Sequence, residues 1–430
     1  MPAATRIRSG SQGYSYWLSL AYSSGINQAR DLVSDGLGNF YAAADIPSVT
    51  GGTRDIVVLK FDKSGASVWR RLYGGVGSNA SKGIRMLPNG DVLICAVTET
   101  SHCLISVISP NGSLQWQKKY SSSYQSVPEG VAIDGSGNIY VCGYTRTGSG
   151  AAYELFIAKL DQAGVILWQR KLTNTADAFA YSIAVDSAGN AFAVGSYVAS
   201  SRGLLVAKYN SSGVLQWQRS LTSARDSYGR SVRVDATGNL YACGYTQQLG
   251  ASTYDMGLVV KYDTTGAVIW QRTLSGSIDV LAQKLALSAS GDVFITGHKV
   301  VPGTGQADVI AAKFNASGIL QWQREMVAST TDYNGGISSD PAGELGLFFY
   351  SNSFGSTNNY RLVMARLPQD GSLTGVYPPF TYQASTFVDA VGALTPGTPS
   401  LSDGPHALAE VASALTFYSV SLTRSLIPIL

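Results

Sequence analysis

The side chains that usually carry catalysis or bind metal ions are sparse in this sequence of 430 residues. Its three histidines, His102, His298 and His406, lie in unrelated contexts and lack the spacing of a metal-binding pair. No Gly-x-Ser-x-Gly motif, phosphate-binding loop or Cys-x-x-Cys pair occurs. We therefore expect no catalytic residue, no metal ion and no cofactor, and we predict that the protein is not an enzyme. A lyase or glycosidase that uses carboxylates of a central channel is a weaker alternative.

Basic residues recur two positions after a tryptophan. They are Arg71, Lys118, Arg170, Arg219, Arg272 and Arg324. Such a series could form a ring of cations for an anionic ligand. Alternatively, each stem covers apolar surface between repeats while its head bonds to a turn carboxylate or carbonyl. We favour the second interpretation, because a feature that recurs with every repeat belongs first to the scaffold.

The tryptophans mark an internal repeat. Trp69, Trp116, Trp168, Trp217, Trp270 and Trp322 are 47 to 53 residues apart. About 30 residues before each of them lies a turn of the type Asp-x-x-Gly-Asn or a looser copy, and seven such turns occur in all. The turns could suggest calcium, but they lack the alternating oxygen ligands of a calcium loop. A period of this length indicates a repeat architecture.

One repeat, residues 181–221, predicts four strands. Tyr181 to Asp186 and Asn190 to Ser196 are short apolar or alternating runs joined by a glycine turn, and Leu204 to Tyr209 and Leu215 to Leu221 are two more. Four strands repeated seven times predict an all-β fold, a seven-bladed β-propeller of four-stranded antiparallel blades over residues 24–371. The strand around Trp17, in residues 1–23, has the register of a fourth strand, whereas the seventh repeat lacks one. We expect the N-terminal strand to complete the seventh blade and close the ring.

Loop lengths divide the two faces of such a ring. The turns between first and second strands and between third and fourth strands are short and uniform, whereas the other connections vary in length and content. Function on a rigid scaffold usually lies in variable loops, and tyrosine with small polar residues makes an adaptable contact surface. We predict a recognition face for a glycan or protein, although exposed loops also collect such residues without any ligand. The candidate binding residues are Arg54, Tyr124, Arg146, Tyr153, Arg202, Arg225, Tyr254, Tyr333 and Tyr360.

The repeat resembles a known family. The pattern Asp-x-x-Gly-Asn-x-Tyr, then Lys-x-Asp-x-x-Gly-x-x-x-Trp, is similar to the bacterial β-propeller repeats of the SBBP type. Its Gly-x-x-x-Trp half also resembles the tryptophan-docking motif of quinoprotein dehydrogenases. The resemblance implies a propeller and says little about function. The quinoprotein alternative is disfavoured, because the adjacent cysteine pair and calcium ligands of those enzymes cannot be placed and seven copies occur rather than eight.

Composition limits the partners. The formal net charge is +3, and only 14% of the residues are charged, which favours neither nucleic acid nor acidic membranes as partners. The N-terminus lacks the apolar core of a signal peptide, and no apolar run is long enough to insert into a membrane. Cys95, Cys142 and Cys243 fall at equivalent second-strand positions of different repeats, with Cys103 on a third strand. We expect them to be buried and unbridged, as in a protein made in a reducing compartment.

Residues 372–430 depart from the repeat. Ala407 to Leu415 could form a short helix, and Phe417 to Thr423 alternates like a strand. A weakly charged, apolar segment of this kind would not stay solvated, so it folds back on the propeller or docks into a partner. We favour docking, because the ring should already be closed.

The combined features predict a non-enzymatic virion protein. We expect a bacteriophage tail or capsid-associated propeller, assembled in the host cytoplasm, that presents its loops to a host receptor. Residues 372–430 would anchor it to other virion proteins. The alternative is an exported propeller of the bacterial surface that binds carbohydrate or protein.

Overall fold

The computed structural model describes residues 27–376 and 380–387 with their side chains, apart from 49–50, 76, 99–101, 123, 174–175, 199, 224, 248–253, 301–302, 342 and 354–359. For Tyr377 and for the strands nearer the two ends of the chain it describes the backbone alone. None of the described residues is helical. The described part therefore contains no apolar helix that could span a membrane.

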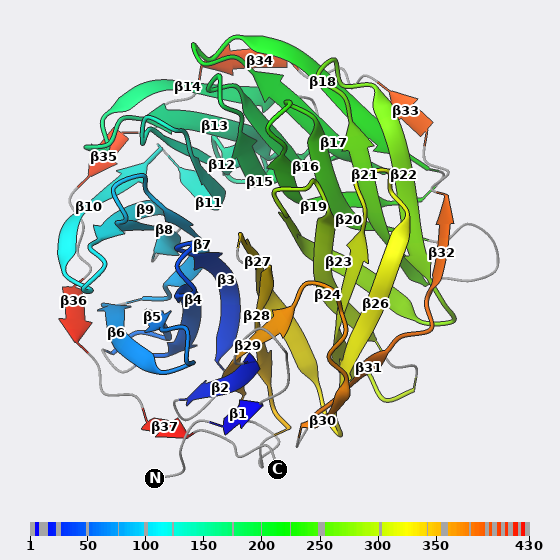
Figure 1. Ribbon diagram of the computed structural model, residues 1–430. Coiled ribbons are helices and arrows are strands. Elements are labelled where there is room, and N and C mark those ends of the chain that lie inside the picture. Colours follow the sequence, from blue (N-terminus) through cyan, green and yellow to red (C-terminus); the bar gives the residue numbers. More distant parts are fainter. Residues whose placement is uncertain are drawn as a thin grey trace.

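The strands form seven antiparallel blades around a central channel (Figure 1). Blade 1 holds β3 (Gln28–Ser34), β4 (Phe40–Pro47), β5 (Arg54–Phe61) and β6 (Ser67–Gly74), and blade 2 holds β7 (Ala80–Met86), β8 (Val92–Thr98), β9 (His102–Ile108) and β10 (Leu114–Ser121). Blade 3 holds β11 (Gln125–Ile133), β12 (Ile139–Arg146), β13 (Glu154–Leu160) and β14 (Ile166–Thr173), and blade 4 holds β15 (Ala178–Val185), β16 (Ala191–Val198), β17 (Arg202–Tyr209) and β18 (Leu215–Thr222). Blade 5 holds β19 (Ser227–Val234), β20 (Leu240–Gln247), β21 (Asp255–Tyr262) and β22 (Val268–Ser275), and blade 6 holds β23 (Asp279–Leu287), β24 (Val293–Val300), β25 (Ala307–Phe314) and β26 (Leu320–Val327). Blade 7 holds β27 (Asp332–Asp340), β28 (Glu344–Ser351) and β29 (Arg361–Pro368). The predicted all-β propeller is confirmed.

The Asp-x-x-Gly-Asn motif works as a turn. In blade 4, Oδ1 of Asp186 accepts hydrogen bonds from the backbone N–H groups of Ala188 (3.0 Å) and Asn190 (2.8 Å). Gly189 takes a φ of 78°, which side chains with a Cβ rarely adopt. The aspartate carboxylate thus accepts hydrogen bonds from the backbone N–H groups of its own turn, in agreement with the structural interpretation of these motifs.

The tryptophans join neighbouring blades. Trp69 Nε1 donates to the carbonyl oxygen of Pro110 in blade 2 at 2.9 Å. The same bond to the turn of the next blade is made by Trp168, Trp217, Trp270 and Trp322. Carbonyl oxygens of these turns also accept from the side chains of Arg71, Arg219, Arg272 and Arg324. The scaffold interpretation is confirmed for these four arginines.

The N-terminal strand closes the ring. β2 (Tyr16–Tyr22) pairs with β29, with Trp17 opposite Arg366 and Ala21 opposite Leu362. Blade 7 is therefore built from both ends of the repeat region, as predicted. β1 (Thr5–Ile7) extends this blade along the other edge of β2.

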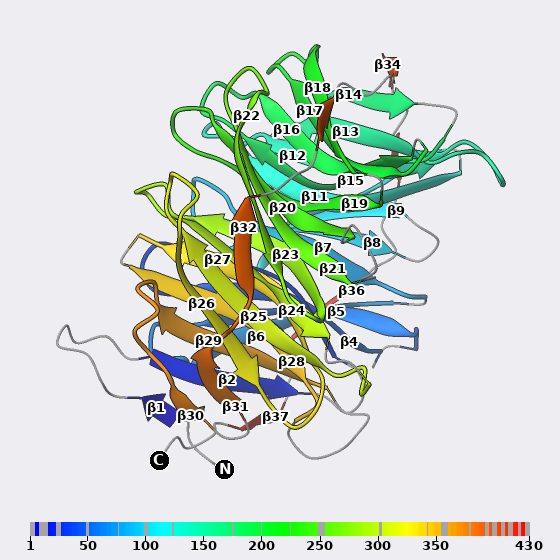
Figure 2. The ribbon, with the colours of Figure 1, turned by 90° about the vertical axis from the view of Figure 1, so that its right-hand side faces the viewer.

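The C-terminal extension wraps around the ring. β30 (Gly375–Tyr377) pairs with β31 (Phe380–Ala384), and β31 then adds to the outer strand of blade 6. Blades 5, 4, 3, 2, 1 and 7 next receive β32 (Val388–Val391), β33 (Thr395–Gly397), β34 (Ser402–Pro405), β35 (Ala409–Val411), β36 (Thr416–Ser419) and β37 (Thr423–Ser425). We call residues 380–425 the strap; its first strands lie on the rim that faces the viewer in Figure 2.

The strap corrects the expectation of a short helix. Ala409–Val411 is a strand and not part of a short helix, because hydrogen bonding to β10 outweighs the local helical pattern. The strap strands lie on the blades of this chain, which is the alternative of folding back. At its start Phe380 and Phe387 are buried, and Phe380 packs edge-on against Phe349 of blade 7 with ring centroids 5.4 Å apart. Attachment to a partner protein through 372–430 stays a prediction.

The cysteines behave as small core residues. Cys95, Cys103, Cys142 and Cys243 are all buried and unbridged, as expected. Burial raises the pKa of Cys142 well above its ordinary value, so this thiol stays protonated at neutral pH.

Candidate functional site

The innermost strand of every blade carries a β-bulge at the same position. The ladder between first and second strands skips one residue in each blade, so that residue has no partner on the second strand. A bulge re-aims the extra side chain, here toward the channel. The bulge residues are Arg30, Lys82, Glu129, Tyr181, Arg230, Gln283 and Gly335.

Glycines on the second strand make room for the bulges in four blades. A Cβ on Gly195 would lie 1.8 Å from the carbonyl oxygen of Phe179, and one on Gly244 would lie 1.8 Å from that of Tyr228. Gly143 and Gly297 are equally crowded in blades 3 and 6. Only glycine tolerates such close approach of the bulged backbone.

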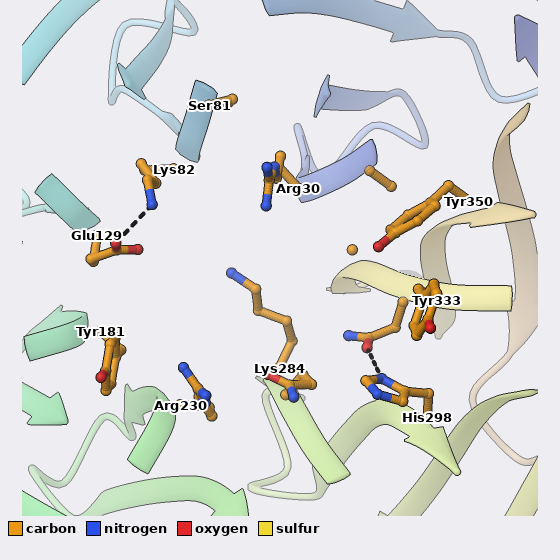
Figure 3. Close-up of a pocket in the computed structure, with 14 residues that line it drawn as sticks. Arg30, Ser81, Lys82, Glu129, Tyr181, Arg230, Lys284, His298, Tyr333 and Tyr350 are labelled. Carbon is orange, nitrogen blue, oxygen red and sulfur yellow. Dashed lines mark hydrogen bonds and ion pairs between the residues drawn. The ribbon is translucent and has the colours of Figure 1, made fainter. Parts of the chain in front are cut away.

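All seven bulge residues line one cavity at the mouth of the channel. Its volume is about 240 Å³. Ser81, Lys284, His298, Tyr333, Asn334 and Tyr350 also contribute to its wall, as Figure 3 shows for most of them. The bulges lie near the start of each first strand, and His298 and Tyr350 lie near the end of a second strand. The cavity therefore opens on the face that carries the variable connections, which we call the loop face.

Three ion pairs neutralise part of the charge in the channel. Arg30 Nε lies 2.6 Å from Asp45 Oδ2 within blade 1. Lys82 Nζ of blade 2 lies 2.7 Å from Glu129 Oε1 of blade 3. Deeper in the channel, Arg85 Nη1 lies 2.6 Å from Asp31 Oδ2. Burial raises the pKa of Asp31, but the positive charges of Arg85, Lys284 and Arg233 outweigh burial and hold that pKa below its ordinary value.

Three further cations have no carboxylate within ion-pair distance among the described residues: Arg230, Arg233 and Lys284. Burial lowers the pKa of Arg233 to about 10, so its guanidinium remains charged at neutral pH. Burial also lowers the pKa of Lys284, and the nearby carboxylate of Asp31 offsets only part of that effect. Figure 3 shows the Lys284 side chain reaching into the middle of the cavity. The channel mouth is thus an electropositive cavity.

Tyrosines hold Arg230 in place. Its guanidinium carbon lies 4.7 Å from the ring centre of Tyr181, 5.6 Å from that of Tyr228 and 5.2 Å from that of Tyr245. Arg230 Nη2 also donates to the hydroxyl of Tyr245 at 2.7 Å. Its Nε is buried and has no hydrogen-bond partner in the described part of the chain. The cage fixes the guanidinium at the wall of the cavity.

Neutral polar groups lie on the wall that blades 6 and 7 form. His298 Nδ1 and Asn334 Oδ1 are 3.3 Å apart, and the His298 ring packs edge-on against Tyr333 with centroids 5.1 Å apart. Burial lowers the pKa of His298, so the imidazole is neutral at neutral pH. This wall offers hydrogen bonds and aromatic surface without charge.

The nine predicted binding residues surround the cavity unevenly. Only Tyr333 lines it. Arg146 lies over Tyr124 (5.2 Å) and Tyr153 (5.0 Å) in blade 3. These distances run from the guanidinium carbon to the ring centres.

The remaining predicted residues lie in neighbouring loops and strand starts. Arg202 lies 5.4 Å from the ring centre of Phe179 and 5.3 Å from that of Tyr228. Tyr360 packs on Tyr350, with ring centroids 5.5 Å apart. Burial raises the pKa of Asp45, and the charges of Arg30 and Arg54 oppose that effect only in part. Arg225 precedes β19 and Tyr254 precedes β21, and neither lines the cavity.

The sequence pattern alone did not identify the bulge residues as candidate binding residues. Their signal is the glycine at the middle of the second strand, as in Cys142-Gly143-Tyr144 and Cys243-Gly244-Tyr245. Glycine inside a strand pattern indicates a bulge or a close backbone approach. Within the described residues, no group of three or more His, Cys, Asp and Glu side chains could hold a metal ion.

Comparisons with known proteins give one matching family model and several similar solved structures. Residues 54–257, somewhat less than half of the chain, match the family described as outer membrane protein assembly factor BamB. None of the curated proteins matches. Two solved structures of puromycin hydrolase are similar. A mutant complexed with PGG has 15% identity and a TM-score of 0.47 over 78% of this chain, and a second structure of puromycin hydrolase has 15% identity and a TM-score of 0.45 over 77%. This chain covers 51% of the hydrolase chain. A Dyadobacter fermentans protein of unknown function is similar at 10% identity and a TM-score of 0.41, with 81% of this chain and 97% of that chain covered. The chain is therefore similar to this family from the third strand of blade 1 to the start of the third strand of blade 5.

Proposed function

We propose that this protein is a non-enzymatic recognition propeller that binds its ligand in the channel mouth on the loop face. The observation that carries the proposal is the convergence of one bulge residue from every blade on one cavity. Binding sites are typically concave and combine apolar walls with a few convergent polar groups. Here the aromatic side chains supply the apolar wall, and the cationic side chains supply the convergent polar groups.

The chemical variety of the bulge residues supports a function for them. The backbone geometry at this position is the same in all blades, yet the residues include arginine, lysine, glutamate, tyrosine, glutamine and glycine. Positions that serve the scaffold, such as the tryptophans, repeat the same residue instead. A position with fixed geometry and variable chemistry is the position at which a ligand can be specified.

The biological setting belongs to the proposal as well. A phage tail or capsid would use the loop face toward a host receptor. A bacterial surface propeller would use it for carbohydrate or protein, and the match to a family described as an outer membrane protein assembly factor supports this alternative. Peptides of the protein in purified virus particles would favour the first setting, and its recovery with the bacterial cell envelope would favour the second.

Binding to an array of glycans and peptides tests the proposal. Full-length protein should give reproducible signals that Tyr333→Ala reduces at least tenfold, because Tyr333 lines the cavity. Leu37→Ala is the matched control, since Leu37 is 79% exposed and lies in a short turn on the opposite face. Thermal unfolding of both variants reports whether they are folded. Equal losses in both, or signals that neither variant changes, would contradict a site in the channel mouth.

A further inference from the structure

We propose that the channel mouth binds an acidic sugar, with its carboxylate held by Lys284 and Arg230. This inference rests on the proposed recognition function and gives that function a ligand class. Three features of the cavity support it: its charge, the rigidity of its donors and the character of its remaining wall.

The charge of the cavity favours an anion. Arg30, Lys82 and Arg85 each have a carboxylate partner, whereas Lys284 and Arg230 have none within ion-pair distance in the described part of the chain. Asp31 offsets the charge of Lys284 only in part, and two cations without a carboxylate in ion-pair contact attract a negative group more strongly at the wall of a partly enclosed cavity than on an open surface, because water screens them less. A carboxylate or another small anion is therefore the complementary ligand group.

The rigid placement of the donor groups favours a specific contact with an anion. Arg230 is fixed by three tyrosine rings and by a hydrogen bond from Nη2 to the hydroxyl of Tyr245, and it lines the cavity. Lys284 reaches into the cavity from the neighbouring blade, as Figure 3 shows. Because the guanidinium is already ordered, little conformational entropy is lost when it binds a carboxylate.

The remaining wall favours a sugar as the carrier of the carboxylate. Tyr333 and Tyr350 present aromatic rings, and the amides of Gln283 and Asn334 can donate to and accept from hydroxyl groups. A volume of about 240 Å³ suits one sugar residue at the end of a chain, with the rest of the glycan leaving over the loop face. A simple anion such as sulfate would use the cations and leave this wall without a role. A peptide carboxylate is the competing occupant.

Isothermal titration calorimetry on the full-length protein tests the inference. The probes are D-glucuronate and N-acetylneuraminate, with D-glucose as the uncharged sugar, inorganic sulfate as the simple anion and acetyl-dialanine as the peptide carboxylate. We expect at least one sugar acid to bind, with affinity that falls as salt rises. Glucose, sulfate and the peptide should bind at least tenfold more weakly. Lys284→Met should weaken binding of the sugar acid at least tenfold, and Lys284→Arg should retain it within threefold.

The matched control is Lys171→Met. Lys171 lies on β14 of blade 3, where it pairs with Glu154 of β13, so the substitution removes the same charge away from the cavity. It should leave binding unchanged. Sulfate or peptide binding as tight as that of the acids, equal binding of glucose, or full binding by Lys284→Met would each overturn the acidic-sugar assignment. If no sugar acid binds while the array still shows ligands that Tyr333→Ala removes, the assignment fails and the recognition function stands. If array and calorimetry are both blank, the recognition function fails with it.

Discussion

Arg85 of blade 2 donates a hydrogen bond of 2.6 Å from Nη1 to Oδ2 of Asp31 in blade 1. The same carboxylate oxygen accepts from the backbone N–H of Ile84 at 3.3 Å. Asp31 is 2% exposed, and it also lies near the positive charges of Arg233 and Lys284. One carboxylate of blade 1 therefore balances three cations contributed by blades 2, 5 and 6, and the inner layer of the channel depends on it.

Asp31→Asn should destabilise the protein strongly. The substitution keeps the shape of the side chain but leaves the cations of the inner channel without their carboxylate. Removing one partner of a buried ion pair typically costs about 3–5 kcal/mol. Urea denaturation should show the loss. Glu154→Gln, which breaks the more exposed pair with Lys171, is the control and should cost about 1 kcal/mol or less. Similar losses in the two variants would contradict this role of Asp31.

Lys284→Met should stabilise the folded protein while it weakens ligand binding. Burial disfavours the charged form of Lys284, as the lowered pKa indicates, and a methionine of similar length removes that penalty. We expect a gain of about 1 kcal/mol in the free energy of unfolding at neutral pH, measured with urea. The opposite changes in stability and affinity would identify a residue kept for binding. A loss of stability would instead assign Lys284 to the scaffold.

Asp332 should make stability depend on pH. It is fully buried, its Oδ2 has no hydrogen-bond partner in the described structure, and burial raises its pKa to about 8. The ordinary pKa of an aspartate in the unfolded chain is about 3.9. Between these values the folded protein keeps a proton that the unfolded chain has released. Its contribution to stability is therefore complete below about pH 4 and is lost as pH rises through about 8.

Asp332→Asn tests this pH dependence. The amide cannot ionise, so the variant should gain stability relative to the wild type by up to about 1.4 kcal/mol per pH unit between pH 5 and pH 8. Urea denaturation of both proteins at pH 5, 6, 7, 8 and 9 measures the difference. A difference that stays constant over this range would show that Asp332 does not hold its proton in the folded state.

The strap should protect the outer edges of the blades. The strap strands pair with the outer strand of every blade, and unpaired strand edges promote association between chains. A chain of residues 1–371 should therefore unfold at lower temperature and associate in size-exclusion chromatography with light scattering. In the full chain, Phe387→Ala should cost about 3 kcal/mol, because Phe387 is buried among residues of blades 5 and 6. Val376→Ala, at a side chain that is 67% exposed, should cost little. A stable monomer of residues 1–371 with unchanged unfolding would contradict a protective strap.

The ring was predictable because its signals repeat. The tryptophans, the glycine turns and the alternation of strands such as Leu215 to Leu221 give the same answer in every repeat, and the register of Trp17 identified the closing strand. The first strand was predicted to start at Tyr181 but begins at Ala178. The bulge at Tyr181 interrupts the alternation there, so the pattern of period two was lost at the residue that matters most.

The cavity could not be predicted from the sequence. It combines residues as distant as Arg30 and Tyr350, which only the closed ring brings together. Ion pairs such as Lys82 with Glu129 join different blades, and the spacing of these residues in the sequence does not predict that they pair. The loop residues were accessible to sequence reasoning, because loop length can be counted, but their position relative to the channel could not.

The strap has a signal with an ambiguous meaning. Large apolar residues recur every seven residues at Phe380, Phe387, Leu394, Leu401, Leu408, Leu415 and Leu422. The strap strands start at the same spacing or one residue from it, once per blade. Seven residues also make two turns of a helix, and this explains the expected helix at Ala407 to Leu415. The pattern becomes clear only when it is compared with seven blades.

The most direct test of the account is an array of oligosaccharide pairs that differ only in a terminal uronic or sialic acid. Wild type, Lys284→Met and Lys171→Met would be measured side by side as full-length proteins. We expect wild type and Lys171→Met to prefer the acidic member of one or more pairs at least tenfold, and Lys284→Met to lose this preference. Equal binding to both members of every pair, or the same preference in Lys284→Met, would contradict the central claim that the electropositive channel mouth is the recognition site.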